Sequence, residues 1–235
     1  MAKVLNIAPN RLAVHPFDMK YGTDTGGYLS PHEVASGGIR DAANNGYSAV
    51  APSVFREACR RWRQTLPSSV APVEAYSFVD VGAGKGRALL LAAELPFRKV
   101  IGVELSEELT RTAQKNILLW KRLAQPRARI RVLHGDAAEF RWPGTPLLVY
   151  LNNPFDCALV NHLAEQLASA AESGPGLVDV LYVNPGCADE LTRSGAGFRL
   201  LWDAQIQMDE ADQQADPYGA SSDRVAAFRY CSKTL

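Results

Sequence analysis

Short apolar runs alternate with longer amphipathic segments from residue 77 to the C-terminal part of the chain. Five of these runs predict β-strands, at residues 77–81, 100–104, 130–133, 147–151 and 178–183. Most segments between them have the length and apolar periodicity of helices, whereas the connection between the third and fourth strands leaves room for one helical turn at most. Strands that alternate with helices are typical of a mostly parallel sheet covered by helices on both faces.

The C-terminal part has a different pattern. Residues 198–207 and 225–231 predict two further strands with no helix between them. Two strands joined in this way favour an antiparallel pair. We therefore expect an α/β sandwich whose sheet has seven strands, five parallel ones and a final antiparallel pair.

The N-terminal part predicts an arm outside this sheet. Residues 1–47 are rich in turn-forming Gly, Asn, Ser and Pro and predict an irregular, loop-rich segment. Residues 52–63 then predict one amphipathic helix, for which Pro52 suits the first position. We expect an arm with a helix over residues 1–72 and a core domain over residues 73–235.

The composition excludes several classes of protein. The chain has 235 residues, 47% of them hydrophobic, with 25 basic and 25 acidic residues. So high an apolar content without net charge indicates a folded core rather than a disordered chain. A neutral balance also weighs against strong nucleic-acid binding, which depends on a basic surface.

The lengths of the apolar runs and the spacing of the cysteines and histidines exclude further classes of protein. No apolar run approaches the roughly 18–20 residues that span a bilayer, and residues 1–31 lack the apolar stretch of a secretory signal. We expect a soluble, cytoplasmic protein with no membrane association. The four cysteines stand far apart without a C-x-x-C pair, and the four histidines show no ligand spacing. These features predict reduced, mostly buried thiols and no metal site.

The segment with the most chemical information follows the first strand of the sheet. Residues 82–86 read G-A-G-K-G and lead into an almost wholly apolar helix. Glycines at this position let the backbone turn tightly and approach a ligand, and the following helix presents free N–H groups. The pattern predicts a nucleotide-like cofactor, although a plain strand-to-helix turn explains the glycines equally well when they are taken alone.

Two acidic residues strengthen this prediction. Glu104 ends the second strand, where a carboxylate can accept hydrogen bonds from both ribose hydroxyls, and Asp136 follows the third strand, where it can bind the amino group of an adenine. Open α/β sheets bind ligands at the carboxyl edge on which these strand ends meet. For either residue alone, a solvated acid at the end of a strand is the plainer explanation.

With these motifs the sequence resembles the class I S-adenosylmethionine-dependent methyltransferases, which have a Rossmann-like sandwich. The resemblance extends over residues 77–231 and implies that S-adenosylmethionine is the cofactor. The spacing of Phe78 and Asp80 from the three glycines is similar to a pattern in the non-SET histone-lysine methyltransferase branch.

The resemblance also implies particular roles. It assigns Asp80, Gly82, Gly84 and Gly86 to the methionine part of the cofactor, Glu104 to the ribose, and Asp136 with Ala137 to the adenine. The other residues it implies at the cofactor are Tyr47, Ala83, Leu105 and Asn152. Tyr47 belongs to the arm, which in many members of this superfamily closes over the cofactor and shapes the acceptor pocket.

Two other interpretations stay open. A nicotinamide-binding Rossmann domain has G-x-G-x-x-G, but its third glycine, counted from Gly82, is Arg87 here, a bulky cation where close packing is needed. A protein that binds S-adenosylmethionine without catalysis, and acts through a partner, would carry the same loop and the same Glu104.

The end of the fourth strand predicts the acceptor side. Asn152-Asn153-Pro154-Phe155 is similar to the Asn/Asp-Pro-Pro-Tyr/Phe motif of methyltransferases that act on amino groups, with Asn153 at the second position in place of Pro. The amides would accept hydrogen bonds from an N–H donor, and the ring would pack on the acceptor. Asn152, Asn153 and Phe155 are therefore the candidate catalytic residues. A helix-capping turn, with Asp156 as the cap and Phe155 in the core, explains the same residues.

We expect an N-directed methyltransferase whose acceptor is a protein lysine, another amine or a small molecule. Residues 209–224 contain five acidic residues against Arg224 alone. In the class I topology the sixth strand runs parallel to the first five, so this loop would leave the sheet at the carboxyl edge. An acidic loop there favours a cationic amine over nucleic acid. A solvated, mobile loop remains the alternative.

Overall fold

The computed structural model of the protein describes residues 14–35, 45–66, 71–153, 155–174, 176–193, 196–216 and 219–231. Its centre is a seven-stranded sheet in the order β5-β4-β3-β6-β7-β9-β8. The strands are β3 (Ser77–Val81), β4 (Lys99–Glu104), β5 (Ile130–His134), β6 (Leu147–Asn152), β7 (Val178–Val183), β8 (Phe198–Gln207) and β9 (Ser222–Tyr230).

The directions of the strands confirm the predicted fold class. β3 pairs in parallel with β4 and β6, and the parallel pairing continues outward to β5 and β7. β9 runs antiparallel to both β7 and β8. β8 therefore points the same way as the first five strands, and the loop that leaves it emerges at their carboxyl edge, as the sequence predicted.

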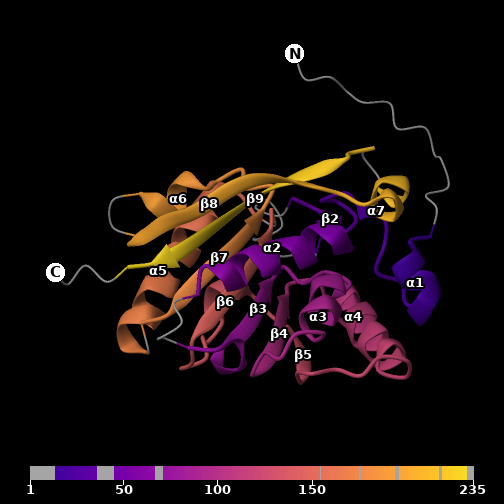
Figure 1. Ribbon diagram of the computed structural model, residues 1–235, viewed down its shortest axis with the longest axis horizontal. Helices are drawn as coiled ribbons and strands as arrows, with labels where there is room; N and C mark the ends of the chain where they lie inside the picture. The colour runs from indigo at the N-terminus through magenta and orange to yellow at the C-terminus, as the bar shows by residue number, and fades with distance from the viewer. Residues whose placement is uncertain are drawn as a thin grey trace, which may run out of the picture.

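Helices cover both faces of this sheet (Figure 1). On one face, α2 (Pro52–Gln64), α3 (Arg87–Ala92) and α4 (Glu107–Trp120) pack over a core that includes Phe78 and Tyr150. α5 (Cys157–Ser173) and α6 (Asp189–Thr192) cover the opposite face. Because strand side chains alternate between the faces, Asp80 lies on the same face as Phe78.

Local capping explains where two of these helices begin. The Ser106 hydroxyl accepts a hydrogen bond from the N–H of Leu109 at the start of α4, and the Asp156 carboxylate accepts one from Leu159 at the start of α5. Both caps were predicted from the sequence. The predicted single turn between β5 and β6 is the 3-10 helix η3 (Ala137–Glu139), while a second 3-10 helix, η2 (Val73–Ala75), precedes β3.

The described part of the arm is more ordered than predicted. It contains α1 (Pro16–Tyr21) and a two-stranded antiparallel sheet of β1 (Tyr28–Leu29) and β2 (Tyr47–Ser48). The prediction of an irregular segment is wrong for these residues because tertiary contacts, described below, stabilise elements too short for sequence periodicity to reveal. The turn-forming residues 36–44 lie outside the described residues.

The prediction of two final strands with no helix between them is also wrong. α7 (Glu210–Ala215) forms there, with Asp209 as its N-cap and the N–H of Asp212 donating to the Asp209 carboxylate at 2.9 Å. The cap and the acidic first turn were visible in the sequence, but they were interpreted only as a charged loop. In Figure 1, α7 lies at the same end of the sheet as α1 and β2.

The cysteine prediction needs a correction as well. Cys157 and Cys187 form a disulfide, although they are 30 residues apart in sequence. Cys157 begins α5 and Cys187 follows β7, so the pairing of β6 with β7 brings them together. Of the two free cysteines, Cys59 is buried, as predicted, and Cys231 is exposed.

Among the described helices, none has both the length and the apolar character needed to cross a bilayer.

A buried polar cluster connects α2 to the sheet. Asp179 on β7 accepts hydrogen bonds from Arg229 Nε at 2.7 Å and from Trp62 Nε1 at 2.7 Å. All three residues are buried. The carboxylate therefore provides hydrogen bonds to the Arg229 guanidinium and the Trp62 indole N–H that water can hardly provide at this depth.

Asp179→Ala should therefore destabilise the fold strongly, because removing one partner leaves the buried Arg229 charge and the Trp62 N–H uncompensated. The free energy of unfolding in urea should fall by about 3–5 kcal/mol. Asp203→Ala is the matched control, since it removes a carboxylate from the more exposed pair with Arg224 and should change stability much less. Equal losses in the two variants would contradict a structural role for the Asp179 cluster.

Candidate cofactor and acceptor site

The glycine loop between β3 and α3 is fixed by its neighbours on both sides. The backbone N–H groups of Gly82 and Ala83 donate to Val103 O on β4 at 2.9 and 3.1 Å. On the other side, the Tyr47 ring lies directly on Gly84, whose φ is +53°, and a Cβ there would come within 2.2 Å of the ring. Only glycine fits this position, because both the backbone conformation and the close ring exclude a side chain.

Glu104 connects this loop to the next strand. Its Oε2 accepts from the N–H of Gly84 at 2.7 Å, and its Oε1 accepts from the N–H of Ser106 at 2.8 Å. Burial raises the pKa of the Glu104 carboxyl, and these N–H groups oppose the shift. The sequence predicted a ribose contact, whereas the structure adds that Glu104 holds the loop in place; each carboxylate oxygen keeps a further lone pair for a ligand.

A cavity lies over the loop at the carboxyl edge of the sheet and encloses about 890 Å³ including its open mouth. We call it the first cavity. Its lining includes these residues predicted from the sequence: Tyr47, Asp80, Gly82, Ala83, Gly84, Glu104, Leu105, Asp136, Ala137, Asn152 and Phe155. The two predicted residues outside the lining are Gly86, where a Cβ would approach Ala113 Cβ to 3.1 Å, and Asn153. Gly86 therefore serves helix packing.

Two buried polar groups in the first cavity have no protein partner. The Tyr150 hydroxyl has no hydrogen bond within the described residues, and the same holds for the Asp80 carboxylate. Tyr150 and Asp80 are paired in register on β6 and β3. Burial, followed by the charge of Glu104, raises the pKa of Asp80 to about 8. Burying such groups unsatisfied is costly, so they mark a place for a polar ligand.

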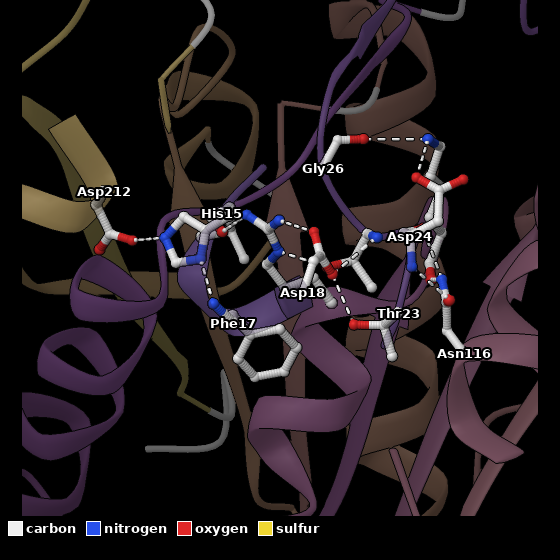
Figure 2. A network of polar contacts seen from close by, with 12 residues as sticks. His15, Phe17, Asp18, Thr23, Asp24, Gly26, Asn116 and Asp212 are labelled. Carbon is white, nitrogen blue, oxygen red and sulfur yellow. Dashed lines mark hydrogen bonds and ion pairs between the residues drawn. The ribbon is translucent and has the colours of Figure 1, made fainter. Parts of the chain in front are cut away.

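The arm is attached to the glycine loop through Arg87, the first residue of α3. The buried guanidinium donates to Asp18 Oδ2 at 2.9 Å, to Thr25 Oγ1 at 2.7 Å and to Val50 O at 3.4 Å. The Asp18 carboxylate in turn accepts from Thr23 and Thr25 (Figure 2). Neither role was predicted: in the sequence Arg87 stands out only as a bulky residue in place of a third glycine, and Asp18 lies in a segment expected to be irregular.

The same network continues on either side (Figure 2). Toward α4, the Asn116 amide donates to Asp24 O at 2.7 Å and to Lys85 O at 3.0 Å, which joins the arm to the loop. Toward α7, His15 Nε2 and Asp212 Oδ1 lie 2.7 Å apart, and Ser53 on α2 also hydrogen-bonds to Asp212. The arm is thus connected to three separate helices of the core.

The predicted acceptor motif is also in contact with the arm. Asn152 Nδ2 donates to Ser48 O at 3.0 Å, and Asn45 Nδ2 donates to the carbonyl oxygens of Asn153 and Phe155 at 3.1 and 3.0 Å. Phe155 is half-buried, lines the first cavity and packs against the core around α5. The structure contains the helix-capping turn with Asp156 as its cap, while contact of this turn with an acceptor stays a prediction. Pro154 lies outside the described residues.

A second, larger cavity adjoins the first and encloses about 1750 Å³ including its mouth. The residues that line both are Gly46, Tyr47, Ser48, Ala49, Val50, Arg87 and Asn152. Much of the second lining is polar and comes from the arm, the glycine loop, the ends of β6 and β7, the segment after β8 and the start of β9: it includes Asp18, Asp24, Lys85, Asn153, Asn184, Asp212, Asp216 and Asp223.

A family model identifies the domain that contains the glycine loop. Residues 79–176, from β3 to the end of the α5 region, match a family model described as a methyltransferase domain. Residues 79–176 are therefore a methyltransferase domain, and the sheet around them has the class I methyltransferase fold. The nicotinamide interpretation of the loop is therefore wrong. A search of curated proteins found no match to the sequence.

Solved structures show the same fold at low sequence identity. The methyltransferase domain of bacterial CtHen1-C is 14% identical, with a TM-score of 0.53 over 77% of this chain and 98% of that one. A proposed RNA methyltransferase from Pyrococcus horikoshii is 17% identical, with a TM-score of 0.50 over 76% and 83% of the two chains. Magnesium protoporphyrin IX methyltransferase from Synechocystis, solved with its cofactor, is 14% identical, with a TM-score of 0.49 over 76% and 77%.

The residues of the first cavity fit S-adenosylmethionine, the cofactor of this methyltransferase. The cofactor has a sulfonium and an amino group, both cationic, and Asp80 is a buried carboxylate without a cationic partner among the described residues. The unpartnered Tyr150 hydroxyl provides a further polar contact.

The raised pKa of Asp80 gives cofactor binding a pH dependence. The carboxyl is protonated below about pH 8. If a cationic group of the cofactor binds the ionised form of Asp80, the affinity for S-adenosylmethionine should increase as the pH is raised toward that pKa. The increase should be up to about tenfold for each pH unit. Calorimetry between pH 6 and pH 7.5 measures this. Asp80→Asn should bind more weakly and without this slope; a flat profile in the unmodified methyltransferase would contradict the contact.

The docking of the arm can be tested at Asp18. Asp18→Asn keeps an oxygen for Thr23 and Thr25 but replaces the acceptor of Arg87 with an amide, so Arg87 is left as an unpaired buried cation. Docking of the arm should weaken by about 3–5 kcal/mol. Native-state hydrogen exchange at the N–H of Asp24, which donates to Asn116, measures this opening. Asp24→Asn, at an exposed carboxylate, is the control; similar exchange rates in both variants would contradict a central role for Asp18.

Proposed function

We propose that this methyltransferase transfers a methyl group to the nitrogen of an amine, on a protein or on a small molecule. The observation that supports this most directly is the shared boundary of the two cavities, at which Asn152 belongs to both linings. The amide oxygen of a residue at that boundary can accept a hydrogen bond from an amine N–H. Such a bond would orient the lone pair of the amine nitrogen toward the methyl group. Asn153, from the same turn, lines the second cavity only.

In this proposal the first cavity holds the cofactor. Glu104 and Leu105 lie at the ribose, Asp136 and Ala137 at the adenine, and the glycine loop with Asp80 at the methionine part. Apart from Lys85 and Gly86 of the loop, all these residues line one continuous space, which supports the assignment. We further propose that the arm, residues 1–72, acts as a lid on the acceptor side, since Tyr47 and Ser48 contribute to both cavities.

Methyl transfer mainly requires that the nucleophile, the methyl group and the sulfur are aligned. The sulfonium supplies a good leaving group, so the chain's own residues have to orient the nucleophile and exclude water, and orientation can account for about 7–11 kcal/mol of the barrier. Tyr47 contributes to exclusion, because its buried ring covers the glycine loop and its hydroxyl donates to Thr25 O at 2.7 Å. The amine must lose its proton before it can attack.

A transfer assay tests the proposal. The protein is incubated with S-adenosylmethionine carrying a labelled methyl group and with panels of amines, peptides, RNA and hydroxylated small molecules. Label on the nitrogen of an amine supports the proposal. Label on RNA or on oxygen contradicts it, and S-adenosylmethionine binding without transfer to any acceptor would favour a non-catalytic binding protein.

Asn152→Ala separates a role toward the acceptor from one toward the cofactor. If its amide contacts the acceptor, kcat/KM for methyl transfer should fall by about tenfold, the upper value for one neutral hydrogen bond, while S-adenosylmethionine affinity changes little. Asn161→Ala, on α5 outside both cavities, is the control and should keep full activity. A loss of cofactor affinity as large as the loss of turnover would place Asn152 at the cofactor instead.

A further inference from the structure

The Cys157–Cys187 disulfide joins the two turns that follow β6 and β7. Each turn contains an asparagine in the left-handed backbone region, Asn153 with a φ of +43° and Asn184 with a φ of +49°, and each leads to one of the two cysteines. β6 and β7 are paired in parallel up to their last residues, so the turns leave the sheet at the same level. The disulfide therefore connects two neighbouring turns through a covalent bond.

The two turns also form part of the wall of the second cavity, which Asn153 and Asn184 both line. A positive φ is unfavourable for a residue other than glycine and persists only where the surroundings impose it. The turns are closely packed, since a Cβ on Gly186 would lie 3.4 Å from Asn153 Oδ1. A change in the link between the turns would therefore change the shape of this wall.

The two turns are attached to the rest of the protein in different ways. Asn184 is held by β9, because its N–H donates to Arg224 O at 2.7 Å and its side chain donates to Asp223 Oδ1 at 2.9 Å. Asn153 is held from the arm, by an exposed hydrogen bond from Asn45 Nδ2 to its carbonyl oxygen at 3.1 Å. The disulfide thus attaches the turn after β6 to the turn that β9 already holds.

The disulfide lies where a thiol can reach it. Cys157 is exposed and Cys187 is half-buried, so an attacking thiol can approach from the side of Cys157. Cys157 is also the first residue of α5, a helix of 17 residues whose positive end stabilises an anion. A thiolate on Cys157 is therefore a good leaving group in thiol–disulfide exchange.

We propose that Cys157 and Cys187 form a thiol–disulfide exchange site, whose reduction loosens the two turns in the wall of the second cavity and so weakens acceptor binding. The reductant is a dithiol. One of its thiolates attacks Cys157 Sγ, the bond between the two protein sulfurs breaks, and Cys187 leaves as a thiolate that takes up a proton. The second thiol of the reductant then displaces Cys157 and closes a cyclic disulfide, so two electrons and two protons pass to the protein.

This goes beyond the proposed function and rests on it only in taking the second cavity as the acceptor side. After reduction, the turn that carries Asn153 can relax from its positive φ. Only the fraction of molecules that keeps the original turn then binds the acceptor, so the apparent affinity falls by that fraction. The cost of one such conformation corresponds to about a 5- to 150-fold loss. KM for the acceptor should rise by this factor, while kcat changes little.

Hydrogen–deuterium exchange on the full chain tests the loosening directly, with saturating S-adenosylhomocysteine in both samples. The oxidised protein is compared with protein reduced by dithiothreitol, and maleimide labelling followed by mass spectrometry verifies that two further cysteines have become reactive. Exchange should become faster in the turns after β6 and β7 and stay unchanged in the glycine loop. The affinity for S-adenosylhomocysteine should also stay unchanged.

Two variants separate this disulfide from other effects of the reductant. The double variant Cys157→Ser/Cys187→Ser should show the faster exchange and the raised KM without any reductant, and should not respond to dithiothreitol. Cys231→Ser is the matched control, because it removes the exposed free thiol and leaves the disulfide in place. It should respond to dithiothreitol as the unmodified protein does.

Four results would overturn the proposal: a disulfide that dithiothreitol does not reduce in the folded protein, reduction without faster exchange in the turns, equally faster exchange in the glycine loop, or an unchanged KM for the acceptor. The third result would indicate that the disulfide stabilises the whole fold. A protein that transfers no methyl group to any amine contradicts the proposed function instead, and the exchange measurements then still decide whether reduction loosens the turns.

Discussion

The buried ion pair between Arg87 and Asp18 is the interaction on which the geometry of the site depends. Arg87 begins the helix that follows the glycine loop, and Asp18 belongs to the first helix of the arm, so the pair joins the two parts of the chain that border both cavities. An unpaired charge at either residue would be costly in so buried a place, which makes the pair effectively obligatory. Docking of the arm then places the Tyr47 ring on Gly84, and the absence of a side chain at Gly84 makes that contact possible.

The sheet places the other half of the site. Asp80, Glu104 and Asn152 come from three different strands, yet they line one cavity because β4, β3 and β6 are adjacent and parallel and end at one edge. The direction of β8 extends this logic to the second cavity, since the segment that follows it carries Asp212 and leads to Asp223 in the lining of that cavity. The two cavities thus lie next to each other along a single edge of the sheet, and the arm packs against both.

A feature of this structure could be predicted from the sequence when the residues that form it are close together along the chain. The strands, α2 and the caps Ser106 and Asp156 depend on local patterns, and they were predicted to within a few residues. α1 and the β1–β2 pair were missed because hydrogen bonds to residues far along the chain stabilise them. The disulfide was missed for the same reason, since only the β6–β7 pairing brings its cysteines together. The pairing of Arg224 with Asp203 was not predicted either, because it depends on the register of β8 and β9.

Two similar turns, whose likeness was not predicted from the sequence, border the second cavity. Asn153 and Asn184 follow the adjacent strands β6 and β7, each precedes a proline, and their φ values are +43° and +49°. Such a conformation costs of the order of 1–3 kcal/mol for a residue other than glycine and persists only where the surroundings impose it. Here the Cys157–Cys187 disulfide joins the segments just beyond the two turns, and a Cβ on Gly186 would lie 3.4 Å from Asn153 Oδ1, which shows how closely they pack. The glycine loop achieves its shape by giving up side chains, whereas these two turns keep their amides in the same unusual backbone region. Both amides line the second cavity, so under the proposed function the polar side chains are retained despite the strain because an acceptor N–H needs a hydrogen-bonding oxygen there.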